Sequence, residues 1–131
     1  MERQIKFRGK NIHTGEWLYG DYHREGKTHY ITKPGDYLRE YAPIEFIVDE
    51  KTVGQFTGML DKNGKEIYEG DVVLQQAYSG KKPMLVRFEH GAFVTGEHSG
   101  SSTAIRPMLI QKRCEVLGNI YDNPGLISKK Q

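Results

Sequence analysis

The chain has 131 residues, 37% of them apolar, which suits one compact domain with one hydrophobic core. Its 19 Lys and Arg nearly balance its 17 Asp and Glu, and a net charge of +2 favours neither a polyanion nor a membrane surface as partner. The single cysteine, Cys114, excludes an internal disulfide and a thiolate zinc site. Because the sequence shows no signal-peptide pattern and no long apolar run, we expect a cytoplasmic protein without a membrane-spanning segment.

The N-terminal part of the chain has the alternating apolar and polar pattern of short strands. The strands predicted there cover residues 5–8, 16–19, 21–23, 28–31 and 45–48. Between the third and fourth of these we expect a hairpin turn with Gly26 at positive φ. We expect an irregular connection over residues 33–43 and one helical turn over residues 49–52.

The rest of the chain also consists of predicted strands and turns. These strands cover residues 55–57, 67–68, 72–74, 85–89, 92–95, 108–110 and 115–117. Asn63-Gly64 predicts a hairpin turn, because both residues tolerate positive φ. A two-residue turn at His90-Gly91 would place Phe88 directly opposite Phe93.

The last elements are a loop and a short helix. Residues 96–103 are rich in Gly and Ser and predict a flexible loop. Asn123-Pro124 is typical of an N-cap followed by proline at the first helical position, and it predicts a short helix through Ile127.

Three sequence blocks follow one another along the chain and together cover most of it. They are IKFRGK at 5–10 with TGEW at 14–17, TVGQFTG at 52–58 running into DKNGKEIYEGD at 61–71, and EVLGNIYDNP at 115–124. In these blocks the chain resembles the YopX family of phage and prophage proteins. The resemblance implies a mainly β fold whose C-terminal part is similar to a small Src-homology-3-like barrel. It carries over no catalytic residue, and Gly125 departs from the family pattern, which has an acidic residue there.

Several residues of these blocks form a turn signature that we expect to serve the fold. It comprises Asn63, Gly64, Tyr68, Gly70, Asp71, Gly118, Asn119, Tyr121 and Asn123. The nearby acidic cluster of Glu66, Glu69 and Asp71 could hold a cation or activate water. We favour turn chemistry, in which Asp71 accepts backbone N–H bonds where the hairpin enters the next strand.

Histidine and cysteine chemistry is not favoured by the sequence. Adjacent residues of a strand point to opposite faces, so neither Glu89-His90 nor Glu97-His98 can chelate a metal through both members. The other histidines, His13, His23 and His29, lack the i, i+4 spacing of a helical metal site. Cys114 follows two basic residues, but an inert thiol is favoured over a nucleophile. We expect no metal and no cofactor.

The basic residues Lys6, Arg8 and Lys10 recur with period two. We therefore expect them on the solvent face of the first strand, with Ile5 and Phe7 facing the core. Tyrosines elsewhere in the N-terminal part could supply stacking surfaces, as in sheets that bind single-stranded nucleic acid. The alternative is a solvated edge strand whose charges prevent aggregation.

The predicted fold is mainly β and comprises one domain over residues 1–131. In it, an N-terminal region of β-hairpins over residues 1–58 packs on a small barrel-like roll over residues 59–127. The predicted function is that of a non-enzymatic phage accessory protein that binds a macromolecular partner, more readily protein than nucleic acid, and it could form a homo-oligomer. Nucleic-acid binding through the cationic strand is the alternative, and an enzyme of unrecognised chemistry comes third.

Overall fold

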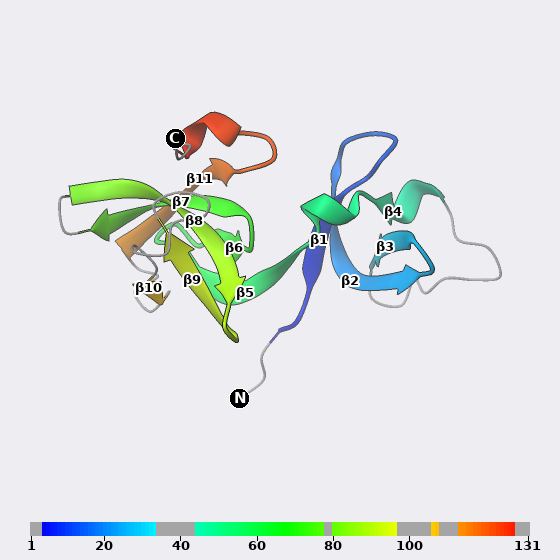
Figure 1. Cartoon of the computed structure of the whole chain (residues 1–131), viewed down its shortest axis with the longest axis horizontal. Helices are drawn as coiled ribbons and strands as arrows, with labels where there is room; N and C mark the ends of the chain where they lie inside the picture. Colours follow the sequence, from blue (N-terminus) through cyan, green and yellow to red (C-terminus); the bar gives the residue numbers. More distant parts are fainter. Residues whose placement is uncertain (1–3, 34–43, 78–79, 97–105, 108–112, 128–131) are drawn as a thin grey trace. The chain divides into compact units, whose positions relative to one another are not determined.

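The structure, a computed structural model, describes residues 4–33, 44–77, 80–96, 106–107 and 113–127. They form antiparallel strands in two sheets, with only short 3₁₀ helices between them (Figure 1). The mainly β prediction is therefore confirmed. None of the described helices is long or apolar enough to cross a membrane.

The chain divides into two compact units, Met1–Phe56 and Thr57–Gln131. The division lies two residues before the boundary predicted at residues 58 and 59. That the chain forms one domain stays a prediction.

Unit 1 contains most of the first sheet. Its elements are β1 (Phe7–Lys10), β2 (Trp17–Glu25), β3 (Thr28–Thr32), η1 (Ile44–Phe46), β4 (Ile47–Val48) and η2 (Glu50–Thr52). The strand order is β4-β3-β2-β1-β5-β6, where β5 (Gly54–Leu60) continues into unit 2 and β6 is Glu66–Tyr68. η2 is the helical turn predicted at residues 49–52, whereas η1 replaces the first half of the strand predicted at residues 45–48.

The β2–β3 hairpin follows the local sequence closely. β2 ends at Glu25 and β3 begins at Thr28, which leaves Gly26 and Lys27 as the turn. Gly26 has φ +59°, as a type II′ turn requires at its first central position. The prediction of positive φ at Gly26 is confirmed.

Unit 2 contains the second sheet. Its strands are β7 (Asp71–Ala77), β8 (Gly80–Glu89), β9 (Ala92–Gly96), β10 (Arg106–Pro107) and β11 (Cys114–Asn119), in the order β10-β9-β8-β7-β11. In the described part of the chain, the barrel-like roll that was expected here is an open sheet, with β10 and β11 as its two edges. The strands predicted at residues 55–57, 67–68, 72–74, 85–89, 92–95 and 115–117 lie within observed ones.

The core of unit 2 has two apolar clusters because alternate residues of a strand face opposite sides of the sheet. One cluster comprises Ile67, Val73, Met84, Val86 and Cys114. The other comprises Val72, Leu85 and Ile127, with Ile120 and Leu126 against it. The 3₁₀ helix η4 (Pro124–Leu126) supplies part of this second cluster at the C-terminal end of the described chain (Figure 1).

The turn between β8 and β9 has the predicted geometry. His90 and Gly91 have φ values of +52° and +82°, and the register places Phe88 opposite Phe93. The centroids of the two phenyl rings are 5.0 Å apart, with the rings edge to face. The two-residue turn and the phenylalanine pair are confirmed.

Two turn predictions need correction. Gly64 has φ +85°, but His90 is the one described non-glycine residue with positive φ, so Asn63 does not share this conformation. The cause is a longer turn, in which Asp61 N–H donates to Lys65 O and Gly64 N–H donates to Asp61 O. The final helix is one 3₁₀ turn, and the Asn123 side chain does not cap it.

Some predictions fall on parts of the chain outside the described residues. These are the connection over most of residues 33–43, the loop over nearly all of residues 96–103 and the strand at residues 108–110.

Candidate functional site

The candidate site is a surface of β1 and β2 where cations and aromatic rings lie side by side. The antiparallel register pairs Arg8 with Tyr19 and Lys10 with Trp17, and directly paired residues project from the same face. On the other side of β1, the N–H of Phe56 donates to the carbonyl oxygen of Lys6. The cation–aromatic face is defined here as Lys6, Arg8, Lys10, Trp17, Tyr19 and Phe56.

Each cation of this face stacks on an aromatic ring. Arg8 Cζ lies 4.5 Å from the centroid of the Trp17 ring, and Lys10 Nζ lies 5.7 Å from the same centroid. Lys6 Nζ lies 5.3 Å from the centroid of Phe56. These distances are within the ~6 Å range of cation–π attraction, which favours indole and guanidinium partners. The face is therefore held in place by its own side chains.

The expectation that all three basic residues point into solvent is wrong for Arg8. Arg8 is 5% exposed, whereas Lys6 and Lys10 are half-buried. A guanidinium is planar and weakly hydrated, so it can stack on the indole of Trp17 where an ammonium would keep its water. Tyr19, at 48% exposure, is the most accessible ring of the face.

The apolar side of β1 also differs from expectation. The strand begins at Phe7, and Ile5, which was expected to face the core, precedes it and is 54% exposed. Phe7 does pack inward, with its ring centroid 5.5 Å from that of Tyr22.

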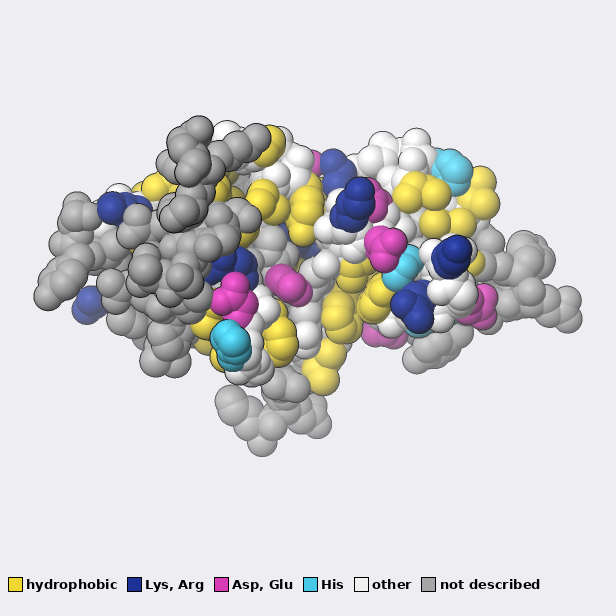
Figure 2. Space-filling model, in the orientation of Figure 1, with side chains coloured by type: hydrophobic (Ala, Val, Ile, Leu, Met, Phe, Trp, Pro, Cys, Tyr) yellow, Lys and Arg dark blue, Asp and Glu magenta, His cyan; other side chains and the backbone are white. Residues whose placement is uncertain are grey.

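Charge is mixed on the described part of the face shown in Figure 2. On the face shown in Figure 2, Lys and Arg side chains are interspersed with Asp, Glu and apolar side chains. This distribution agrees with the small net charge of +2. On this face, the described residues form no broad basic area of the kind by which proteins grip a phosphate backbone.

The acidic cluster of Glu66, Glu69 and Asp71 takes part in local bonds. Asp71 is buried, and its Oδ2 accepts the N–H of Tyr68 at 2.8 Å, which is the turn chemistry expected of it. Glu66 Oε1 accepts the hydroxyl of Tyr68 at 2.9 Å, and Glu69 is half-buried. Among the described residues, no three His, Cys, Asp or Glu side chains are placed to hold a metal ion.

The other turn-signature residues hold backbone in place. A Cβ on Gly70 would lie 2.9 Å from Tyr121 Cε2, so the tyrosine ring packs where a side chain would be. Asn119 Oδ1 accepts the N–H groups of Tyr121 and Asp122, and a Cβ on Gly118 would collide with Asn123. These contacts give the signature a structural role.

Asp61 is a key residue that sequence reasoning missed. It is buried, and its carboxylate accepts the N–H groups of Asn63, Lys65 and Val116. Burial raises the pKa of Asp61, but the three backbone amides and Lys65 lower it, and the net pKa lies below the ordinary value of 3.8. An Asp at the start of a turn is a signal that could have revealed the first two bonds, whereas the third depends on the fold.

Cys114 and the histidines have different surroundings. Burial, together with the charge of Asp61, raises the pKa of Cys114, which suits the inert thiol that was favoured. His23 stacks on Tyr30, and His90 lies in the β8–β9 turn. His29 is buried and contacts Tyr22 and Glu50, a grouping that its sequence spacing did not reveal.

Comparison with known proteins gives a family and a fold. The family model described as YopX protein matches residues 6–128. The solved structure of protein EF1440 from Enterococcus faecalis is 23% identical, with a TM-score of 0.53 over 97% of this chain and 100% of that one. No curated protein matches this chain. At this identity the solved structure supports the fold alone.

Proposed function

The protein belongs to the YopX family, and from that premise we propose that it is a non-enzymatic phage or prophage accessory protein. In this proposal it acts in the cytoplasm of the bacterial host and binds a macromolecular partner through the cation–aromatic face. The partner is a protein that presents acidic side chains beside an apolar surface. The match to the family supports the phage association, and the face supports the binding role.

One observation carries the proposal: Arg8 and Lys10 stack on Trp17 next to the half-exposed ring of Tyr19. Trp and Tyr are among the residue types that contribute most to protein interfaces. Because the rings and cations already hold one another, little side-chain freedom is lost when a partner binds. The two half-buried lysines would give the face its preference for acidic groups.

Protein is favoured over nucleic acid because of the position of Arg8. Arginine forms the strongest bidentate contacts with phosphate, and this arginine is 5% exposed over an indole ring. Two lysines remain. For a single strand, their contacts would give the plot of log affinity against log salt concentration a slope of only about 1.4 in magnitude.

Nucleic-acid binding is the second candidate, and the exposed ring of Tyr19 between lysines favours it. Base stacking on such a ring contributes ~1–3 kcal/mol per base. Fluorescence anisotropy with labelled single- and double-stranded DNA across salt concentrations tests this candidate. We expect weak binding or none at physiological salt; sub-micromolar binding that Lys6→Gln with Lys10→Gln abolishes would place nucleic acid first.

Quantitative capture from host cells that carry the phage tests the protein partner. The bait is the wild type or the variant Lys10→Gln with Tyr19→Ala, each with and without nuclease. Phe88→Ala is the matched control, because Phe88 is 50% exposed and lies on β8 in unit 2. We expect the wild type and Phe88→Ala to capture a partner protein with or without nuclease. The double variant Lys10→Gln with Tyr19→Ala should not capture it. Equal capture by all three baits would contradict the proposal, and light scattering shows whether the partner is a second copy.

A further inference from the structure

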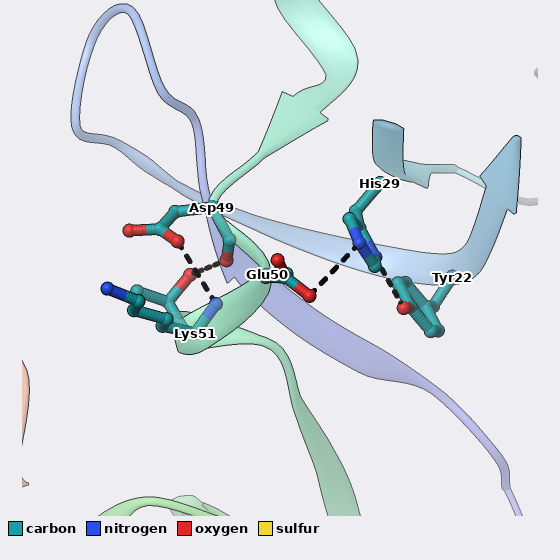
Figure 3. Close-up of polar contacts among 6 residues, drawn as sticks. Tyr22, His29, Asp49, Glu50 and Lys51 are labelled. Atoms are coloured by element: carbon teal, nitrogen blue, oxygen red, sulfur yellow. Dashed lines mark hydrogen bonds and ion pairs between the residues drawn. The ribbon is translucent and has the colours of Figure 1, made fainter. Parts of the chain in front are cut away.

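Three polar side chains of unit 1 form a chain that links β2, β3 and η2 (Figure 3). The hydroxyl oxygen of Tyr22 lies 2.7 Å from His29 Nδ1, and His29 Nε2 lies 3.3 Å from Glu50 Oε2. A hydroxyl, an imidazole and a carboxylate in this order have the arrangement of a nucleophile, its base and a group that orients the base.

The fold fixes the first two members through the β2–β3 register. Tyr22 pairs with Ile31, so His29, two residues earlier, is its diagonal neighbour on the same face. The two rings are nearly parallel, with an interplanar angle of 7° and centroids 5.8 Å apart. In this position the imidazole edge meets the phenol hydroxyl (Figure 3).

The third member is placed by the turn that precedes β5. Lys51 N–H donates to Asp49 Oδ1 at 3.0 Å, which caps η2 just before Glu50 (Figure 3). Thr52 Oγ1 donates to Asp49 O and accepts the N–H of Lys10. η2 is thus attached to β1, and Glu50 is held within reach of His29.

The chemistry of the groups decides which nitrogen carries the proton. An ionised carboxylate only accepts hydrogen bonds, so Glu50 favours the tautomer of His29 that is protonated at Nε2. The lone pair of Nδ1 then faces the Tyr22 hydroxyl and accepts a hydrogen bond from it. The His29 side chain is 9% exposed and that of Glu50 is 67% exposed, so the base is shielded from water while its orienting group is not.

A purely structural role explains less of this arrangement. Tyr22 is only partly buried, and water can satisfy a hydroxyl at such a position. Burial of the phenol alone therefore does not require its hydroxyl to bond to His29.

We infer that Tyr22 is an activated nucleophile and a site of stoichiometric self-acylation by an activated acyl donor. The phenol oxygen attacks the carbonyl carbon of the donor, and the phenol proton passes to His29 Nδ1. The bond between the carbonyl carbon and the leaving group breaks, and the leaving group departs with the bonding electrons. The imidazolium beside Glu50 then gives its proton to the leaving group, and the product is an ester of Tyr22.

The donor is an uncharged acyl compound rather than a phosphoryl compound. Glu50 is anionic and mostly exposed, so it repels a phosphate. The register places Arg24 of β2 directly opposite His29, but Glu50 is the charged group that bonds to the imidazole. One transfer per chain is a modification, and it is compatible with the non-enzymatic role proposed above.

N-acetylimidazole is the probe, and mass spectrometry of peptides from the full chain measures the acetylation rate of each tyrosine. Tyr19 and Tyr121 are internal controls because, at 48% and 38% exposure, both are more accessible than Tyr22. Exposure alone ranks Tyr22 below them. General-base assistance reverses this order, since it contributes on the order of 10²-fold or more, and we expect Tyr22 to react at least about tenfold faster than either.

Two variants separate activation from structure. His29→Gln should reduce labelling of Tyr22 to the rate of the controls, and Glu50→Gln should reduce it several-fold. If buried Tyr30 becomes reactive in His29→Gln, that variant is unfolded and Glu50→Gln, which alters an exposed side chain, decides. Labelling of Tyr22 no faster than Tyr121, or unchanged by the deciding variant, would overturn the inference.

Discussion

The carboxylate of Asp61 accepts the backbone N–H of Val116 at 2.9 Å, although the two residues are 55 positions apart in the sequence. The adjacent Lys62 N–H donates to the carbonyl oxygen of Cys114. Both bonds engage backbone groups of β11, an edge strand of the second sheet. The turn after β5 therefore covers part of an edge that would otherwise be able to pair with another chain.

Replacing Asp61 by alanine should destabilise the protein by ~2–3 kcal/mol, because three backbone amides lose a charged acceptor. Chemical denaturation of both proteins measures the change. Asp49→Ala is the control, since Asp49 is exposed and its carboxylate accepts one hydrogen bond, from the backbone N–H of Lys51 at the start of η2. A loss at position 61 no larger than that of the control would show that the Asp61 bonds contribute little.

The stabilisation by Asp61 should depend on pH. Its pKa in the folded protein is below 3.8, so the folded state binds this proton less readily than the unfolded state. The contribution is therefore fully present above the unfolded pKa and is lost as the pH falls through the lower, folded pKa. Melting curves of the wild type and Asp61→Asn from neutral pH to pH ~2 should converge in acid; a constant difference would contradict this account.

The three basic residues of β1 should differ in their effect on stability. Arg8→Gln should cost at least about 1 kcal/mol, since it removes a buried guanidinium stacked on Trp17. Lys6 and Lys10 are half-buried, so Lys6→Gln and Lys10→Gln should each change the free energy of unfolding by no more than ~0.5 kcal/mol. Urea denaturation of the three variants measures their free energies of unfolding. Equal losses of stability would mean that stacking of Arg8 on the indole contributes no more than the two lysines do.

Gly64→Val should cost ~1–3 kcal/mol, because a β-branched residue is strained at φ +85°. A Cβ there would meet no atom within 4 Å, so strain is separated from steric collision. Asn63→Ala is the neighbouring control and should stay within ~0.5 kcal/mol, since Asn63 does not have positive φ. Thermal unfolding measures both, and a Gly64→Val protein as stable as the control would refute the strain.

The sequence predicted local features well because they depend on a few adjacent residues. The turns at Gly26 and at His90-Gly91 follow from glycine at positions that require positive φ, and the Phe88–Phe93 pair follows from the second turn. Alternation along β1 placed Lys6, Arg8 and Lys10 on one face. It could not show that Trp17, on the neighbouring strand, lies against two of the three cations and that Arg8 is buried there.

Contacts between distant segments were beyond the sequence. Asp61 reaches Val116, and His29 joins Tyr22 to Glu50, only after the strands have paired. The resemblance implied a small barrel or roll, and in the described residues this part of the chain forms an open sheet, not a closed barrel.

Site-specific crosslinking tests the central claim, binding of a protein through the cation–aromatic face, most directly. The photoreactive aromatic residue benzoylphenylalanine replaces Tyr19 on β2 or, as control, Phe88 on β8, at positions 48% and 50% exposed. After irradiation in the host, we predict a discrete protein adduct from position 19 that survives nuclease and is absent from position 88. Identical adducts from both positions, or adducts at position 19 that nuclease removes, would contradict the claim.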